Sequence, residues 1–61
     1  MIFKHWHVWR GNGVMLSNEN TKELKQFNTL DDVINYLFLN GERPAARYFN
    51  ERKAGFENEK R

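Results

Sequence analysis

The residues most suggestive of chemistry are two histidines near the N-terminus, His5 and His7. They stand two positions apart, so on a β-strand both imidazoles lie on one side, which is a spacing that metal sites use. A structural or catalytic metal site needs three or four ligands, and the chain has no third His and no Cys. We therefore expect neither a metal nor a cofactor.

Hydroxyl groups that could serve as nucleophiles occur at Ser17, Thr21 and Thr29. Nucleophilic catalysis needs such a group beside a base, with donors for a developing oxyanion. Thr29 instead fits the N-cap of a following helix, and Ser17 falls in a predicted strand with no evident oxyanion donors. Asp31 and Asp32 are adjacent, so on a helix they point about 100° apart and form no carboxylate dyad. We expect that the chain is not an enzyme.

Basic residues gather in the C-terminal half. Arg43 and Arg47 are four residues apart and share a helix face, and Arg52 and Lys53 extend the basic character. Phosphates attract such a row, and aromatic side chains on a sheet can stack on bases. The alternative is a solvated helix face on which Arg47 pairs with Glu51. The net charge is only +2, which is low for a DNA-binding protein.

The N-terminal third predicts a β-hairpin. Residues 2–10 are rich in aromatic and β-branched side chains and lack Gly and Pro, which favours a strand, and residues 14–17 predict the returning strand. Between them, Gly11, Asn12 and Gly13 tolerate the positive φ that tight turns require. Residues 22–27 fit either a third strand or a helical turn, and the short polar turn before them slightly favours the strand.

The length of the hairpin loop decides which face of the first strand is buried. A two-residue loop places Trp9 on the same face as Val14 and Leu16, whereas a three-residue loop places Trp6 and Val8 there. We favour three residues, because a glycine-ended loop of this length is common and groups the cleaner apolar set. That set is Ile2, Trp6, Val8, Val14 and Leu16, and it leaves Phe3, His5, His7, Trp9 and Met15 on the other face.

Such an uncovered face would be an interaction surface. The alternative is that the second helix or the C-terminal tail covers it, for instance through Phe56, because so small a domain can leave little apolar area exposed.

Two helices are predicted after the strands. Thr29 is a good N-cap, Asp31 and Asp32 complement the helix dipole, and Asn40-Gly41 provides the stop. One apolar stripe runs along this helix through Leu30, Val33, Ile34, Leu37 and Phe38. A second helix is predicted to begin at Pro44 and to end at Gly55, with Ala45, Ala46, Tyr48 and Phe49 on its apolar face.

Length and composition bound the class of protein. The 61 residues allow a single domain, which we place at 1–56 with a frayed tail at 57–61. We expect an α+β fold: a small antiparallel β-hairpin or three-stranded sheet packed on an amphipathic helix, followed by a short second helix. The chain has no signal-like start and no apolar run that could span a bilayer, so we expect no membrane association and a cytoplasmic location. Absent cysteines fit that compartment.

One stretch resembles a known family. Trp6-His7-Val8 opens a strand, a glycine turn follows, and Lys25-Gln26-Phe27-Asn28-Thr29-Leu30-Asp31-Asp32-Val33 leads into a helix. Over about residues 6–39 this is similar to the three-stranded-sheet-plus-helix pattern of AP2 and integrase arm-type DNA-binding domains. The resemblance implies a sheet that enters the major groove. Its DNA contacts would fall on His5, His7, Trp9 and Arg10.

These observations predict a non-catalytic binding module. The expected contact surface combines the strand residues with the basic helix and comprises His5, His7, Trp9, Arg10, Arg43, Arg47, Arg52 and Lys53. Nucleic acid and protein are near-equal partner classes: one reading is an accessory regulator of the phage or mobile-element kind that contacts nucleic acid. The other is an adaptor or inhibitor that binds a protein. The chain could act as a monomer or as a homodimer.

Overall fold

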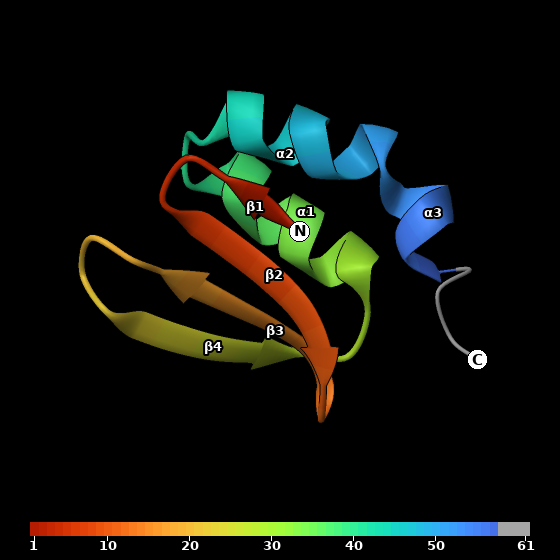
Figure 1. Cartoon of the computed structure of the whole chain (residues 1–61). Helices are drawn as coiled ribbons and strands as arrows, with labels where there is room; N and C mark the ends of the chain where they lie inside the picture. The colour runs from red at the N-terminus through yellow and green to blue at the C-terminus, as the bar shows by residue number, and fades with distance from the viewer. Residues whose placement is uncertain (58–61) are drawn as a thin grey trace.

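Four antiparallel strands followed by three helices make up the computed structural model, which describes residues 1–57 (Figure 1). The strands form one sheet in the spatial order β1-β2-β3-β4, so each strand pairs with its neighbour in sequence. Their bounds are β1 Ile2–Phe3, β2 Trp6–Gly11, β3 Gly13–Asn18 and β4 Glu23–Phe27. The helices are α1 Leu30–Leu39, α2 Arg43–Glu51 and α3 Lys53–Glu57. The expected α+β class is confirmed, with one strand and one short helix more than expected.

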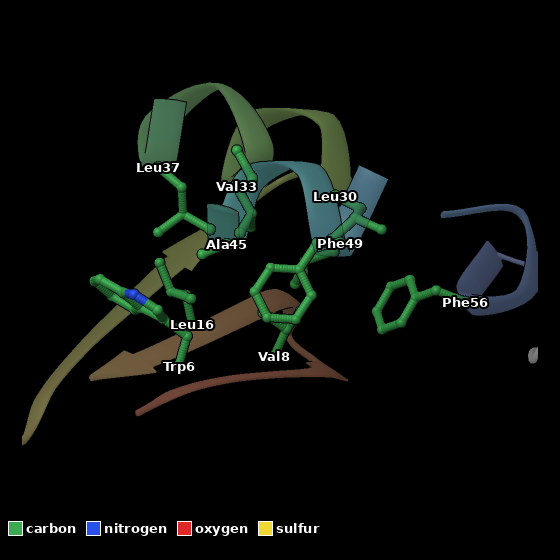
Figure 2. Packing of buried hydrophobic residues seen from close by; sticks show 11 residues of the cluster. Trp6, Val8, Leu16, Leu30, Val33, Leu37, Ala45, Phe49 and Phe56 are labelled. Atoms are coloured by element: carbon green, nitrogen blue, oxygen red, sulfur yellow. The ribbon is translucent and has the colours of Figure 1, made fainter. Parts of the chain in front are cut away.

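The core lies between one face of the sheet and the helices. Figure 2 shows Trp6, Val8 and Leu16 of the sheet directed toward residues of α1 and toward Phe49 of α2. Within residues 1–57 all of the buried side chains are hydrophobic: Trp6, Val8, Val14, Leu16, Leu30, Val33, Leu37, Ala45, Ala46, Phe49 and Phe56. Because a chain of this size has little apolar surface to bury, one Trp and two Phe supply much of the core volume.

The register of the β2–β3 hairpin follows the three-residue loop. Val8 pairs with Leu16, Arg10 with Val14, and Gly11 with Gly13. Side chains of directly paired residues share a face, so Trp6 and Val8 join Val14 and Leu16 in the core, as expected. Gly13 has φ +81°, a left-handed conformation that glycine adopts without steric cost.

The first strand is interrupted, which the sequence did not predict. Residues 2–10 form two strands, because the chain reverses at Lys4 and His5 and Lys4 takes a left-handed φ of 54°. The reversal places Ile2 opposite His7 and Phe3 opposite Trp6. Ile2, expected in the core, is therefore 61% exposed. Phe3, expected on the other face, packs against the core with its ring 4.7 Å from that of Tyr48.

The ambiguous segment at residues 22–27 forms the edge strand β4. Lys25 pairs with Leu16 and Phe27 with Val14, so the ladder with β3 overrides the helix propensity of Lys, Glu and Gln.

Helix α1 begins and ends where the sequence predicts. The Thr29 hydroxyl accepts a hydrogen bond from the Asp32 backbone N–H at 3.2 Å, and Asn40 is the C-cap. Leu30, Val33 and Leu37 are buried, whereas Phe38 at the end of the predicted apolar stripe remains 51% exposed.

The C-terminal helical region departs from the prediction at Gly55. Helix α2 ends at Glu51, and Gly55 lies inside α3 rather than ending a helix. Phe56 of α3 is buried in the helix-side core, so it does not cover the other face of the sheet. Glu57 is the last residue of α3, and the rest of the expected frayed tail, residues 58–61, lies outside the described residues. No helix within residues 1–57 has the length and apolarity needed to cross a membrane.

Candidate binding surface

The sheet face turned away from the helices is the first candidate for function. Strand alternation and register place seven side chains on it, and we call them the open sheet face: Ile2, His7, Trp9, Met15, Ser17, Leu24 and Gln26. The helices lie on the opposite side of the sheet (Figure 1). Within residues 1–57 none of these side chains is buried, and Leu24 is 59% exposed. The face therefore presents large apolar groups to solvent, which is the property of an interaction surface.

The centre of the open sheet face is an aromatic and thioether cluster. The rings of His7 and Trp9 lie with centroids 4.9 Å apart at 52°, and Trp9 pairs directly with Met15 across β2 and β3. Gly11 makes room for this arrangement. A Cβ at that position would stand 3.1 Å from Met15 Cγ and 3.6 Å from Trp9 Nε1. The cluster is thus packed on the backbone of the hairpin end.

The open sheet face carries no Asp, Glu, Lys or Arg among its seven residues. Two of its polar members form hydrogen bonds within the chain. The Ser17 hydroxyl donates to Glu19 Oε2 at 2.7 Å, and Gln26 Nε2 donates to the Asn12 carbonyl at 2.5 Å. Gln26 lies on the edge strand, whereas Ser17 lies between His7 and Leu24, so uncharged hydrogen-bonding groups stand among the apolar ones.

Four residues of the predicted first strand were expected to contact a partner: His5, His7, Trp9 and Arg10. Two of the four lie on the open sheet face. These are His7 and Trp9. His5 lies in the turn between β1 and β2, with its ring 4.9 Å from that of Trp6. Arg10 extends on the helix side, where its guanidinium stacks 4.6 Å from the Phe56 ring and donates to the Phe56 carbonyl at 3.3 Å.

The four basic residues of the predicted contact surface that follow the sheet lie on α2, on α3 and at the junction between them, on the other side of the sheet from Trp9: Arg43, Arg47, Arg52 and Lys53. Arg43 stacks 5.3 Å from the ring of Phe38, and Arg52 stacks 3.8 Å from that of Tyr48. Glu51 lies 4.0 Å from Arg52, so within the described residues its ion pair is with Arg52 and not with Arg47, as the solvated-face alternative had it. The predicted composite surface is therefore divided between two faces of the molecule.

Lys53 is tied to α1. Its ammonium donates to Asp31 Oδ1 at 2.7 Å, which joins the start of α3 to the first turn of α1. The hydrogen bond to Asp31 and the attraction of that carboxylate raise the pKa of Lys53 above its ordinary value. This contact gives Lys53 a structural role.

A groove of about 530 Å³ separates the exposed surfaces of α1 and α2. Its lining includes Phe38 and Asn35 from α1 together with Arg43, Arg47 and Asn50 from α2. Two guanidinium groups beside an exposed aromatic ring can contact phosphate and a base at once.

Ile2 and Leu24 belong to the open sheet face but were missed by the sequence analysis. Ile2 was assigned by simple alternation along one continuous strand, and the turn at Lys4 reverses that assignment. Leu24 lies in the segment whose secondary structure was ambiguous. The polar turn at residues 18–21 was the available signal for β4, because Leu24 and Phe27 stand three positions apart and do not show the alternation of a strand.

Residues 1–57 contain no group of three or more His, Asp or Glu side chains placed to hold a metal ion. Comparisons with protein-family models, with curated proteins and with solved structures found no match to this chain.

Proposed function

We propose that this chain is a non-catalytic binding module that docks a protein partner on its open sheet face. The observation that carries the proposal is the cluster of His7, Trp9 and Met15, with Ile2 and Leu24 beside it, on a sheet face that no helix of residues 1–57 covers. Trp and Met are enriched at protein interfaces, where they supply large contact areas.

The absence of charge on this face favours a protein over a nucleic acid. Binding to a nucleic acid depends on cations that neutralise phosphates, and the seven residues include no Lys or Arg. If the sheet docked on DNA as in the AP2 and integrase arm-type domains, His7 and Trp9 would reach the DNA. Arg10 would not, because its guanidinium stacks on Phe56 on the helix side. The partner we infer is a protein surface of uncharged, apolar side chains interspersed with hydrogen-bonding groups.

The roles of the hydroxyl groups support a non-catalytic function. Ser17 donates to Glu19, Thr21 Oγ1 accepts from the Glu23 backbone N–H at 3.3 Å, and Thr29 caps α1. Each hydroxyl considered as a nucleophile is thus engaged in a turn or a cap. On this proposal the module acts in the cytoplasm, in keeping with its cysteine-free composition.

The test uses an affinity capture with matched variants. Trp9→Ala and Met15→Ala remove the centre of the open sheet face, and Phe38→Ala removes an exposed aromatic residue from the helix side. A protein retained by the wild-type chain should be lost with the first two variants and retained with the third, at both low and high salt.

The captured protein is then titrated into the ¹⁵N-labelled chain. Shifts confined to the amides of β2, β3 and β4 and to the Trp9 indole support the proposal. Equal capture by wild type and Trp9→Ala, or shifts confined to α1 and α2, would overturn it.

The groove between α1 and α2 supports a second candidate, nucleic-acid contact. Arg43 and Arg47 border it, and Phe38 offers a face on which a base could stack. Fluorescence anisotropy with single- and double-stranded oligonucleotides tests this candidate. The affinity of the chain for the oligonucleotide should fall steeply as the salt concentration rises. Arg47→Ala should lower the slope of log affinity against log salt concentration by about one, and Trp9→Ala should leave the affinity unchanged. An oligonucleotide affinity that is the same for wild type and Arg47→Ala would reject nucleic-acid contact at this groove.

A further inference from the structure

The outer edge of β4 is unpaired in the described part of the chain. The sheet ends with β1 on one side and β4 on the other, and no strand of residues 1–57 lies beyond either. β1 has only two residues, whereas β4 has five. A free edge of that length is a template for a further strand.

The phase of the hydrogen-bond ladder identifies which residues of β4 face outward. Met1 and Val8 exchange both backbone bonds, at 2.6 and 2.7 Å, so the backbone groups of Val8 point toward β1. Along two antiparallel strands, residue pairs that exchange backbone hydrogen bonds alternate with pairs that do not. Because Val8 bonds toward β1, its neighbour Trp9 bonds with Met15 of β3. By the same alternation Leu16, next to Met15, bonds with Lys25 of β4. The backbone N–H and C=O of Leu24 and Gln26 therefore point away from the sheet.

We propose that β4 pairs with β4 of a second copy of this chain, antiparallel and centred on Leu24, to give a homodimer with one continuous sheet. In this register Leu24 faces Leu24 of the second copy, and the two residues exchange backbone hydrogen bonds. Glu23 then stands directly opposite Lys25 of the second copy, and the two-fold axis repeats this pair. Opposite charges at directly paired positions stabilise antiparallel strands.

The charges select this register over its neighbours. A register centred on Glu23 would set Glu23 opposite Glu23 of the second copy, and one centred on Lys25 would set the two lysines opposite each other. Like charges at directly paired positions are destabilising. A register centred on Gln26 would set Lys25 against Phe27 of the second copy. Only the Leu24-centred register pairs both charges with their complements.

The side chains involved are accessible for such pairing. Leu24 and Glu23 are exposed, and the Lys25 ammonium lies on the helix side, 5.5 Å from the Tyr36 ring centroid. A single pair of short strands buries little area, and Lys22 N–H is already bonded to the Asn18 carbonyl. We therefore expect a weak, concentration-dependent dimer.

The first test is sedimentation equilibrium from micromolar to millimolar concentration. The weight-average mass should rise from the 7.4 kDa of one chain toward twice that value. A mass that stays at that of one chain across the whole range would overturn the proposal.

Charge exchange tests the register. Glu23→Lys places two positive side chains on the edge and Lys25→Glu two negative ones, so each variant alone should dimerise at least about tenfold more weakly. An equimolar mixture of the two, and the double variant, should recover the wild-type association. Glu51→Lys on α2 is the charge-matched control. Single variants that associate like wild type, or a mixture that stays monomeric, would refute this register.

Amide hydrogen exchange provides a readout that needs no substitution. The Leu24 amide should become more protected as the concentration of the wild-type chain rises, while that of Ile2, which faces outward from β1, should not change. Equal protection at all concentrations would contradict the pairing. The inference is independent of the proposed function, because Trp9→Ala should abolish partner capture and leave dimerisation intact.

Discussion

Trp6 and Trp9 stand three residues apart on β2 and face opposite sides of the sheet. Trp6 is 7% exposed, and its indole N–H donates to Glu42 Oε1 at 3.4 Å beneath the helices. Trp9 lies on the open sheet face beside His7 and Met15. The difference follows from strand alternation, because an odd separation always reverses the face.

Truncation of the two tryptophans should therefore have different consequences. Trp6→Ala leaves a large cavity in the core and should lower the free energy of unfolding by about 3–5 kcal/mol. Trp9→Ala should lower it by no more than about 1 kcal/mol, since its ring is only partly covered. Urea unfolding followed by circular dichroism measures both. A Trp9→Ala variant as unstable as Trp6→Ala would show that Trp9 belongs to the core.

Gly13 and Gly41 form a matched pair for testing the hairpin. Both have left-handed φ, at +81° and +80°, so replacement by Ala costs about 1–2 kcal/mol at either site. A Cβ at Gly13 would also stand 2.5 Å from the Phe27 carbonyl oxygen, whereas one at Gly41 meets nothing within 4 Å. Gly13→Ala should thus be the more destabilising variant in thermal unfolding. Equal losses would mean that β4 does not approach the hairpin loop so closely.

Gly55 offers a stabilising substitution. It lies inside α3, has no left-handed φ, and a Cβ there meets nothing within 4 Å. Gly55→Ala should raise the free energy of unfolding by about 0.5–1 kcal/mol, because Ala restricts the unfolded chain and favours helix. Ala54→Gly in the same helix should produce a loss of similar size. A lower melting temperature for Gly55→Ala would place Gly55 at a helix end, as the sequence had indicated.

The Lys53–Asp31 contact predicts a specific dependence on pH. Because Asp31 raises the pKa of Lys53, the folded chain holds this proton more tightly than the unfolded chain does. The stabilisation is therefore complete below the ordinary lysine pKa and is lost as the pH rises through the raised pKa of the folded state. Lys53→Gln should destabilise the chain near neutral pH, and the difference from wild type should vanish in strong alkali.

Urea unfolding from neutral to strongly alkaline pH measures the free energy of unfolding of wild type and Lys53→Gln. Lys22→Gln is the control, because this lysine lies in the turn between β3 and β4, away from Asp31. A difference that persists unchanged above the raised pKa would exclude the ion pair as its cause. High salt should also reduce the effect of Lys53→Gln, because the pair is exposed.

Local signals in the sequence were sufficient for the hairpin and for the first helix. Gly11-Asn12-Gly13 supplied the turn chemistry, and the grouping of Trp6 and Val8 with Leu16 gave the register. Thr29 and Asn40-Gly41 marked both ends of α1, since capping depends on residues within one turn. Each of these features is determined by interactions between residues that are close in sequence.

The turn at Lys4 and His5 had no such signal. Neither residue is a typical turn former, and Lys4 accepts a left-handed φ because the reversal lets Phe3 pack on Tyr48 and Phe49. Likewise, residues 22–27 have helix-favouring composition and become a strand only through pairing with β3. Interactions between residues that are far apart in sequence determined both the turn at Lys4 and His5 and the strand β4.

The sequence by itself thus determined the α+β class, the hairpin register and the buried residues Leu30, Val33 and Leu37 of α1, because periodicity and capping are local properties. Only the tertiary structure decided that Trp9 and the arginines of α2 lie on opposite sides of the molecule and that Arg10 is engaged by Phe56. Those relationships depend on how the helices cross the sheet, and that arrangement is set by packing of the whole core rather than by any one segment.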